Sequence, residues 1–130
     1  MQDPLRVVVV DDSLDAAASL AILLELNGHE VRTAYDGLEA VSTADEYRPD
    51  VVLLDLGLPK LSGHDAARRI RAQEWGRHMV LIAVTGWGGA EDRARSLEAG
   101  FDHHLVKPVD PGGLMRLLAS LGPAPTRGAG

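Results

Sequence analysis

Polar residues with the chemistry of phosphoryl transfer stand at the ends of strand-like runs in this chain. They are Asp11, Asp12, Asp55, Thr85 and Lys107. Carboxylates held close together repel one another, and a divalent cation that prefers oxygen ligands, such as Mg²⁺, relieves the repulsion. An ionised carboxylate can attack phosphorus, while an ammonium group and a hydroxyl hold the phosphoryl oxygens. These residue types therefore indicate Mg²⁺-assisted transfer of a phosphoryl group to an aspartate.

The runs that precede these residues have the length and composition of buried strands. Residues 51–54 (Val-Val-Leu-Leu) are too few for a helix and half of them are β-branched, which fits a strand buried on both faces of a parallel sheet. The strands are expected at residues 5–10, 30–34, 51–55, 79–84 and 101–106, the second of them at an edge of the sheet.

Helix patterns separate the strands. Ser13, Asp36 and Asp110 are placed to cap helices, and Pro111 takes a first helical position, where its missing N–H costs nothing. The helices are expected near residues 13–27, 36–47, 62–74, 90–99 and 110–121. Strands that alternate with helices predict an α/β fold with a doubly wound, five-stranded parallel sheet and five helices.

Right-handed crossovers place the carboxyl ends of all parallel strands at one edge of such a sheet. Ligands of open parallel sheets bind at that edge. The three aspartates, Thr85 and Lys107 are therefore expected to converge there.

Composition excludes several classes of function. The 130 residues are 45% hydrophobic and 25% charged, which is typical of one soluble globular domain. The formal net charge of −6 argues against direct binding of nucleic acid or of a membrane surface. Without cysteine, disulfides and thiolate metal sites are excluded. No apolar run approaches the roughly 20 residues of a membrane span, and residues 1–4 do not resemble a signal peptide, so we expect a cytoplasmic location.

The order of the motifs resembles the receiver domain of response regulators in bacterial two-component and phosphorelay systems. An acidic pair follows the first strand, an aspartate the third, Thr-Gly the fourth and Lys-Pro the fifth, and the match runs over residues 5–121. The resemblance implies a flavodoxin-like receiver fold with strand order 2-1-3-4-5. It also implies a receiver domain at residues 1–121, followed by a Pro/Gly-rich tail at 122–130 that we expect to be disordered.

The resemblance assigns roles to the pocket residues. Asp55 becomes the phosphoacceptor, assisted by Lys107, which would hold the phosphoryl group beside a Lys107–Pro108 bond that is commonly cis in this family. Asp12 would bind Mg²⁺ directly and Asp11 mostly through water. Asp55 and the backbone carbonyl of Gly57 would complete the protein's share of the metal ligands, and no organic cofactor is expected.

Two further residues are assigned to the conformational switch. Thr85 would be drawn toward the phosphate, and His104 takes the position that often holds Tyr or Phe in this family. Because histidine titrates, we hypothesise that the charge state of His104 biases the switch near neutral pH. Gly57 lacks a side chain and Trp87 adds a large one near the pocket, so the lifetime of the aspartyl phosphate does not follow from the family average.

The expected partner is a histidine kinase or a histidine phosphotransfer protein, which donates the phosphoryl group. The domain itself would be a phosphoacceptor that catalyses its own phosphorylation, and not an enzyme, in a monomer or weak dimer. Only nine residues follow Leu121, so either a free-standing regulator or a receiver from a hybrid histidine kinase is expected. Residues 100–110 resemble receivers attached to hybrid kinases.

Alternative functions remain open at this point. A Mg²⁺-dependent phosphatase with an aspartyl-phosphate intermediate typically needs a second Asp two residues after the nucleophile, where this chain has Gly57. A nucleotide-binding fold would need a glycine-rich turn where Asp11 and Asp12 stand. A degenerate receiver that only binds proteins is a third alternative. His64, in the first turn of a helix, is expected to be a solvated surface residue.

Overall fold

The structure is a computed structural model that describes residues 4–86 and 89–121. Strands and helices alternate along the chain as the sequence predicts. The strands are β1 (Arg6–Val10), β2 (Glu30–Ala34), β3 (Val51–Asp55), β4 (Val80–Thr85) and β5 (His103–Val106). The helices are α1 (Leu14–Leu26), α2 (Gly37–Tyr47), α3 (Gly63–Ala72), the 3₁₀ turn η1 (Glu74–Gly76), α4 (Ala90–Ala99) and α5 (Pro111–Ser120).

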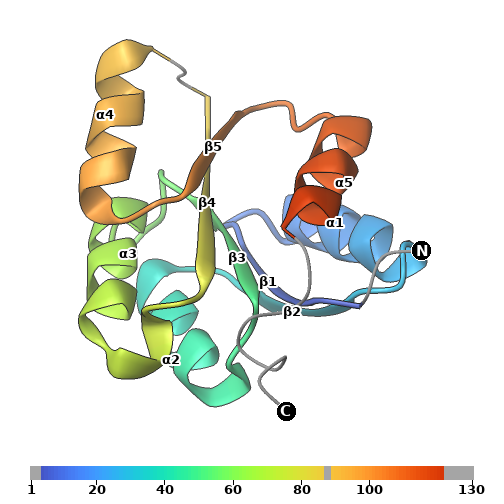
Figure 1. Ribbon diagram of the computed structural model, residues 1–130, viewed down its shortest axis with the longest axis horizontal. Helices are drawn as coiled ribbons and strands as arrows, with labels where there is room; N and C mark the ends of the chain where they lie inside the picture. The colour runs from blue at the N-terminus through green and yellow to red at the C-terminus, as the bar shows by residue number, and fades with distance from the viewer. Residues whose placement is uncertain (1–3, 87–88, 122–130) are drawn as a thin grey trace.

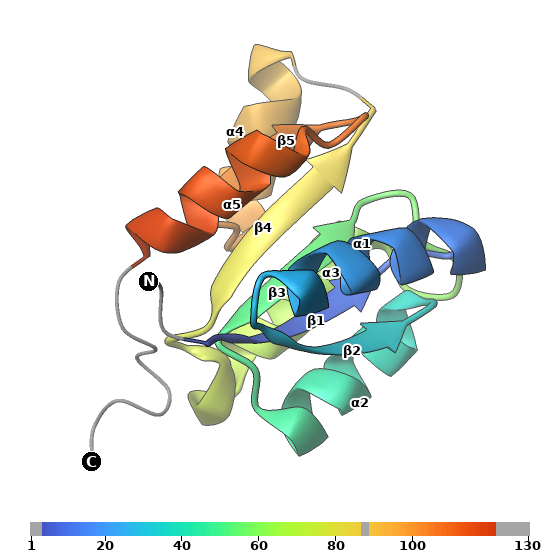
Figure 2. The ribbon, with the colours of Figure 1, turned by 90° about the vertical axis from the view of Figure 1, so that its right-hand side faces the viewer.

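The strands form one parallel sheet in the order β2-β1-β3-β4-β5, which confirms the predicted topology. In Figure 1, α1 and α5 lie on one side of the sheet, and α2, α3 and α4 lie on the other. Figure 2 looks onto the side that α1 and α5 cover. Helices on both faces explain why the inner strands are apolar throughout instead of alternating with polar residues.

The sheet separates two apolar cores, one on each face. Successive side chains of a strand point to opposite faces, so Val8 packs with α2, α3 and α4, while Val7 packs with α1 and α5. Leu114 and Leu118 of α5 are buried in the second core, as the periodicity of that helix predicts.

Four helices begin with a side-chain cap at the positions that the sequence favours. Each capping side chain accepts a hydrogen bond from the backbone N–H three residues later. The caps are Ser13, Asp36, Ser62 and Asp110. These caps lie in the segments that follow β1, β2, β3 and β5, at the carboxyl edge of the sheet.

The observed boundaries differ from the predicted ones at the other edge. The third helix ends at Ala72 and not near Glu74, because Gln73 is extended with ψ at 143° and a 3₁₀ turn follows. Phe101 is not part of the fifth strand, because its N–H donates to the carbonyl of Ser96 and closes the end of α4. The predicted tail at 122–130 lies outside the described residues. Within the described part of the chain, no helix is long and apolar enough to cross a membrane.

Candidate functional site

Three carboxylates meet at the carboxyl edge of the sheet. Asp11 and Asp12 follow β1, Asp55 ends β3, and one oxygen from each lies within 4.8 Å of the others. Asp11 and Asp55 are only 6% and 7% exposed, whereas Asp12 is open to solvent. Clustered carboxylates that are partly desolvated are a fitting donor set for a hard divalent cation. The predicted convergence of the aspartates is therefore confirmed.

The carboxylate of Asp55 is oriented at both of its oxygens. The backbone N–H of Gly57 donates to Oδ1 at 2.9 Å, and Nζ of Lys107 donates to Oδ2 at 2.8 Å. Asp11 is held in a similar way, because the N–H of Ser13 donates to its Oδ1 at 2.9 Å. Charge-assisted hydrogen bonds of this kind are the stronger ones, so the two acidic side chains are fixed before any ligand arrives.

Lys107 is the cation of the site. Its Nζ lies 2.8 Å from Asp55 Oδ2 and 3.6 Å from Asp11 Oδ2, so one ammonium group bridges two carboxylates. The hydrogen bond to Asp55, reinforced by the charges of Asp55 and Asp11, raises the pKa of Lys107 although partial burial opposes the shift. The backbone N–H of Lys107 donates to the carbonyl of Thr85 at 2.7 Å, and the Lys107–Pro108 bond is cis, as the resemblance implies.

Thr85 and Gly86 complete the wall of the pocket. Thr85 ends β4 and is buried, and no atom of a described residue lies within 4 Å of the position that a Cβ on Gly86 would take. Both line a cavity of about 270 Å³ together with Asp55 and Gly57. The geometry therefore leaves open space beside the Asp55 carboxylate.

His104 lies apart from this cavity. Its ring sits on β5 and faces α4, where Nδ1 is 3.2 Å from the hydroxyl oxygen of Ser96. The Ser96 hydroxyl donates its one proton to the carbonyl of Asp92 at 3.0 Å, so Nδ1 of His104 is the donor of the other hydrogen bond. The hydrogen bond between His104 and Ser96 connects β5 to α4.

Comparison with known proteins decides the family. Residues 7–119 match the family model described as the response regulator receiver domain. The chain belongs to this family. PrrA, a transcriptional regulatory protein of Mycobacterium tuberculosis, is 43% identical to this receiver domain over 103 residues, which are 79% of this chain and 43% of PrrA. The chain thus spans less than half the length of that relative.

Solved receiver structures have the same fold. The receiver domain of the sensor histidine kinase PA1611 from Pseudomonas aeruginosa is 35% identical, with a TM-score of 0.81 over 89% of this chain and 95% of that one. The chemotaxis response regulator CheY4 of Vibrio cholerae is 28% identical, with a TM-score of 0.86 over 92% of this chain and 99% of that one. Receiver domains are signalling domains, so the family places this chain in two-component signal transduction.

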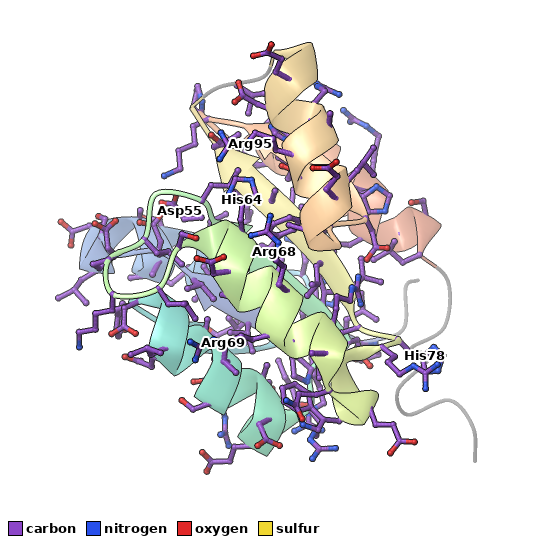
Figure 3. The ribbon with its side chains drawn as sticks, turned by 90° about the vertical axis from the view of Figure 1, so that its left-hand side faces the viewer. Asp55, His64, Arg68, Arg69, His78 and Arg95 are labelled. Carbon is purple, nitrogen blue, oxygen red and sulfur yellow. The ribbon has the colours of Figure 1, made fainter. Side chains whose placement is uncertain are left out.

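Sequence reasoning missed two residues of the receiver pocket, His64 and Arg95. Both line the cavity beside Asp55, and Figure 3 shows them where α3 and α4 meet. The expectation of a solvated His64 holds only in part, because the residue is half-buried: Nε2 is buried and the ring meets Phe101 edge to face, with the ring centroids 6.3 Å apart. Burial lowers the pKa of His64, and the charges of Arg95 and Arg68 lower it further, while the charges of Asp65 and Asp92 oppose the shift.

The helical spacing of residues in the sequence does contain one indication that His64 faces inward. Residues three and four apart share a helix face, so His64 shares a side of α3 with Ala67, which is fully buried. Only the position of α4 makes that side of the helix a pocket wall, and the sequence does not give this position. Trp87, expected near the pocket, lies outside the described residues.

Proposed function

We propose that this receiver domain accepts a phosphoryl group on Asp55 from a phosphohistidine of a histidine kinase or of a histidine phosphotransfer protein. One observation carries the proposal. Asp55 is the carboxylate that Lys107 and the N–H of Gly57 orient toward an open cavity, next to the acidic pair Asp11 and Asp12. No other described acidic side chain combines these neighbours.

The transfer forms one bond to phosphorus and breaks another. An oxygen of Asp55 forms a bond to phosphorus, the bond from phosphorus to the imidazole nitrogen of the donor breaks, and the electron pair leaves with that nitrogen. The ammonium group of Lys107, which lies beside Asp55 Oδ2, binds one oxygen of the transferred phosphoryl group. The Thr85 hydroxyl donates a hydrogen bond to another phosphoryl oxygen. Positioning and charge supply most of the stabilisation in such transfers.

Mg²⁺ is the proposed metal of this receiver domain. Asp11, Asp12, Asp55 and the carbonyl of Gly57 would hold it, and the bound ion would neutralise charge that develops on the phosphoryl oxygens. The receiver domain of PA1611 was crystallised with a magnesium ion coordinated in its active site cleft, which supports the same assignment here. The alternative of a phosphatase with two catalytic aspartates has no support, because Gly57 supplies no second acid.

The donor would dock where the pocket opens between α1 and the segment before α5. A groove of about 700 Å³ runs from Asp11 and Lys107 over Leu20, Leu23 and Val109. Figure 2 shows α1 and α5 on this side of the sheet. An apolar groove that begins at the phosphoacceptor pocket suits a helix of the donor, whose phosphohistidine must reach Asp55.

The phosphorylated domain is proposed to signal through Thr85 and His104. Removal of the Ser96 hydroxyl tests this step, because Ser96 connects α4 to His104. We expect Ser96→Ala to shift the resting amide NMR spectrum of α4 and β5 part of the way toward that of the domain with Mg²⁺ and beryllium fluoride, a phosphoryl mimic. Ser42→Ala is the matched control, since the Ser42 hydroxyl bonds only within α2. A resting Ser96→Ala spectrum unchanged beyond position 96 would contradict the role.

The phosphoacceptor itself is tested by intact mass spectrometry. The domain is incubated with Mg²⁺ and a phosphohistidine-bearing donor protein or a small phosphodonor, with and without EDTA. We expect one phosphoryl adduct that depends on Mg²⁺ and is lost in Asp55→Asn. The control Asp45→Asn replaces an exposed aspartate on α2 and should keep the adduct. Absence of the adduct in the unmodified domain with every donor would favour a degenerate receiver that only binds proteins.

A further inference from the structure

The pocket beside Asp55 extends past the place of the transferred phosphoryl group. Its near end is formed by Asp55, Leu56, Gly57, Thr85 and Gly86, and its far end by His64, Asp92 and Arg95. The volume of about 270 Å³ equals roughly nine water molecules at ~30 Å³ each. A phosphoryl group adds four heavy atoms, so the pocket has room for a further part of the donor molecule.

The far end has side-chain nitrogen atoms without a partner among the described residues. Nε2 of His64 is the one buried side-chain nitrogen or oxygen without a hydrogen-bond partner in the part of the chain that the structure describes. Buried polar atoms are normally paired, so an unpaired one needs an explanation, and a missing ligand is one such explanation. Arg95 forms no ion pair within 4 Å with any described residue. In Figure 3, His64 and Arg95 lie on facing helices beside Asp55.

Two acidic residues lie near this end, and their charges raise the pKa of His64 against the larger effect of burial. Asp92 lies in the first turn of α4, and its Oδ2 is 3.6 Å from the position of a Cβ on the capping residue Gly89. Its charge therefore faces the amino terminus of the helix, where a carboxylate is favoured. Asp65 on α3 pairs with Arg68 at 2.9 Å. Neither carboxylate forms an ion pair within 4 Å with Arg95 or His64, so both residues remain available to an anion.

We propose that His64 and Arg95 form a leaving-group subsite, which binds the acyl oxygens of an acyl phosphate while its phosphoryl group reacts with Asp55. This inference rests on the proposed function of Asp55. An oxygen of Asp55 bonds to phosphorus, the bond from phosphorus to the acyl oxygen breaks, and the electron pair leaves with that oxygen as a carboxylate. His64 and Arg95 act as specificity-determining residues, because negative charge grows on the leaving carboxylate in the transition state.

The chemistry of the leaving group supplies a sharp test. Acetyl phosphate releases acetate, an anion with two oxygens that accept hydrogen bonds. Phosphoramidate transfers the same phosphoryl group but releases neutral ammonia, which has no negative charge for Arg95 to bind and no carboxylate oxygens to accept hydrogen bonds. Both donors need Asp55, Lys107 and the metal, so their comparison isolates the leaving group.

The experiment measures the rate of Asp55 phosphorylation by each donor in the full chain with Mg²⁺. We expect Arg95→Gln and His64→Leu each to slow the reaction with acetyl phosphate about fivefold, as for one lost charge-assisted contact that is partly open to solvent. The reaction with phosphoramidate should stay within about twofold, which also shows that the variant pocket is folded. His64→Gln, which keeps an N–H donor, should recover part of the loss. Arg69→Gln removes an exposed charge from α3 and should change neither rate.

Each other outcome has a defined meaning. Equal slowing with both donors would overturn the subsite, because the two residues would then act on the phosphoryl group or on the fold. Unchanged rates with acetyl phosphate would also overturn it. If the unmodified domain is labelled by phosphohistidine but by neither small donor, the subsite fails while the proposed function stands. If no donor of any kind labels Asp55, the proposed function itself fails.

Discussion

At the scale of single residues, Lys107 sets the charge of the pocket. Three carboxylates and one ammonium group carry a formal charge of −2 (−3 from the aspartates and +1 from the lysine). A divalent cation brings the sum to zero, so the set of residues matches an ion such as Mg²⁺ in charge as well as in ligand type. The ammonium group therefore has two opposite electrostatic effects in the pocket. It relieves repulsion between Asp55 and Asp11, and it repels the metal.

Removal of this charge should strengthen metal binding. In Lys107→Met the two carboxylates lose their bridge, so we expect Mg²⁺ to bind about fivefold more tightly, as for ~1 kcal/mol of relieved repulsion near a protein surface. In EDTA, the thermal midpoint of Lys107→Met should be lower than that of the unmodified domain. On addition of Mg²⁺, the midpoint of the variant should rise more steeply than that of the unmodified domain. Lys60→Met is the control, because Lys60 pairs with Asp36 outside the pocket. Weaker Mg²⁺ binding in Lys107→Met, titrated by calorimetry, would contradict the prediction.

Residues of the site differ in how far the sequence predicts them. Asp11, Asp55 and Lys107 follow strand-like runs, and a parallel sheet brings all strand ends to one edge, so type and position together were sufficient. His64 has a common residue type in a helix, and its role depends on the angle between α3 and α4. That angle follows from packing against Phe101 and the sheet, which no local pattern in the sequence contains.

At the scale of elements, α3 shows how the sheet edge is held. Its first residue, Gly63, lies so close to β3 that a Cβ would sit 2.6 Å from the carbonyl oxygen of Asp55. Any side chain there would push α3 off the strand that carries the proposed phosphoacceptor. At the other end of α3, the side chain of Arg71 reaches three separate segments of the chain.

Arg71 connects α3 to the segments that lead into β4 and β5. Its guanidinium donates to the carbonyls of Gly100, Gly76 and Met79 at 2.6–2.9 Å and to Asp102 at 2.7 Å. Lysine has one ammonium group and cannot follow this forked arrangement, so Arg71→Lys leaves carbonyls without donors. We expect a loss of about 2 kcal/mol in the free energy of unfolding.

Urea denaturation followed by circular dichroism measures this loss. Arg69→Lys serves as the control, because Arg69 is exposed on the same helix and should change the free energy by less than about 0.5 kcal/mol. Equal stability of the Arg71→Lys and Arg69→Lys variants would contradict the role of Arg71 in connecting these segments.

The end of α3 also shows a limit of sequence-based prediction. Caps such as Ser13 and Asp110 are local, and their helices begin where predicted. The third helix stops two residues early because the chain folds back against itself, and a Cβ on Gly76 would lie 2.0 Å from the carbonyl of Ile70. That contact joins the helix to the 3₁₀ turn, and Arg71 fixes it from the side. Helix propensities of the residues in α3 carry no information about either contact.

At the scale of the whole molecule, the sheet order brings distant segments into one pocket. Asp55 and Lys107 are 52 residues apart in the chain, yet their side chains form one hydrogen bond. The alternation of strands and helices predicts the layers, and the four motifs, through their resemblance to receiver domains, predict the order of the strands. Figure 1 shows the result, a single sheet with helices on both of its faces.

The same layered core makes the stability of the whole domain depend on pH. His29 is buried before β2, and its Nδ1 accepts a hydrogen bond from the N–H of Leu5 at 3.1 Å. Burial lowers the pKa of His29, and it lowers the pKa of His64 as well. Both rings are therefore favoured in the neutral form. Protonation of His29 at Nδ1 would remove the acceptor from Leu5 and place a charge in the core.

The sign of the effect follows from these directions. A histidine whose pKa is lowered on folding contributes stability that is fully present above the unfolded pKa of about 6.5, and the contribution is lost as the pH falls through the folded pKa. Asp36, whose pKa is lowered by hydrogen bonding to the N–H of Glu39, contributes stability that is fully present above its unfolded pKa, which is far below pH 5.5, so this contribution does not change between pH 7.5 and pH 5.5. Lys107, whose pKa is raised, keeps its contribution below about 10.5. Between pH 7.5 and pH 5.5 the two histidines therefore dominate among the groups with shifted pKa values.

We expect the free energy of unfolding to fall from pH 7.5 to pH 5.5, and to fall less in the double variant His29→Asn, His64→Gln. The Oδ1 of asparagine takes the place of Nδ1 as the acceptor for the N–H of Leu5, and neither amide titrates, so the variant removes the proton uptake and keeps an acceptor for Leu5. Urea titrations of both proteins at the two pH values give the difference directly. His78→Gln, which replaces an exposed histidine, is the control and should keep the pH dependence of the unmodified domain. If the double variant loses as much stability at pH 5.5 as the unmodified domain, other groups must take up the protons, and the two buried histidines do not link folding to pH.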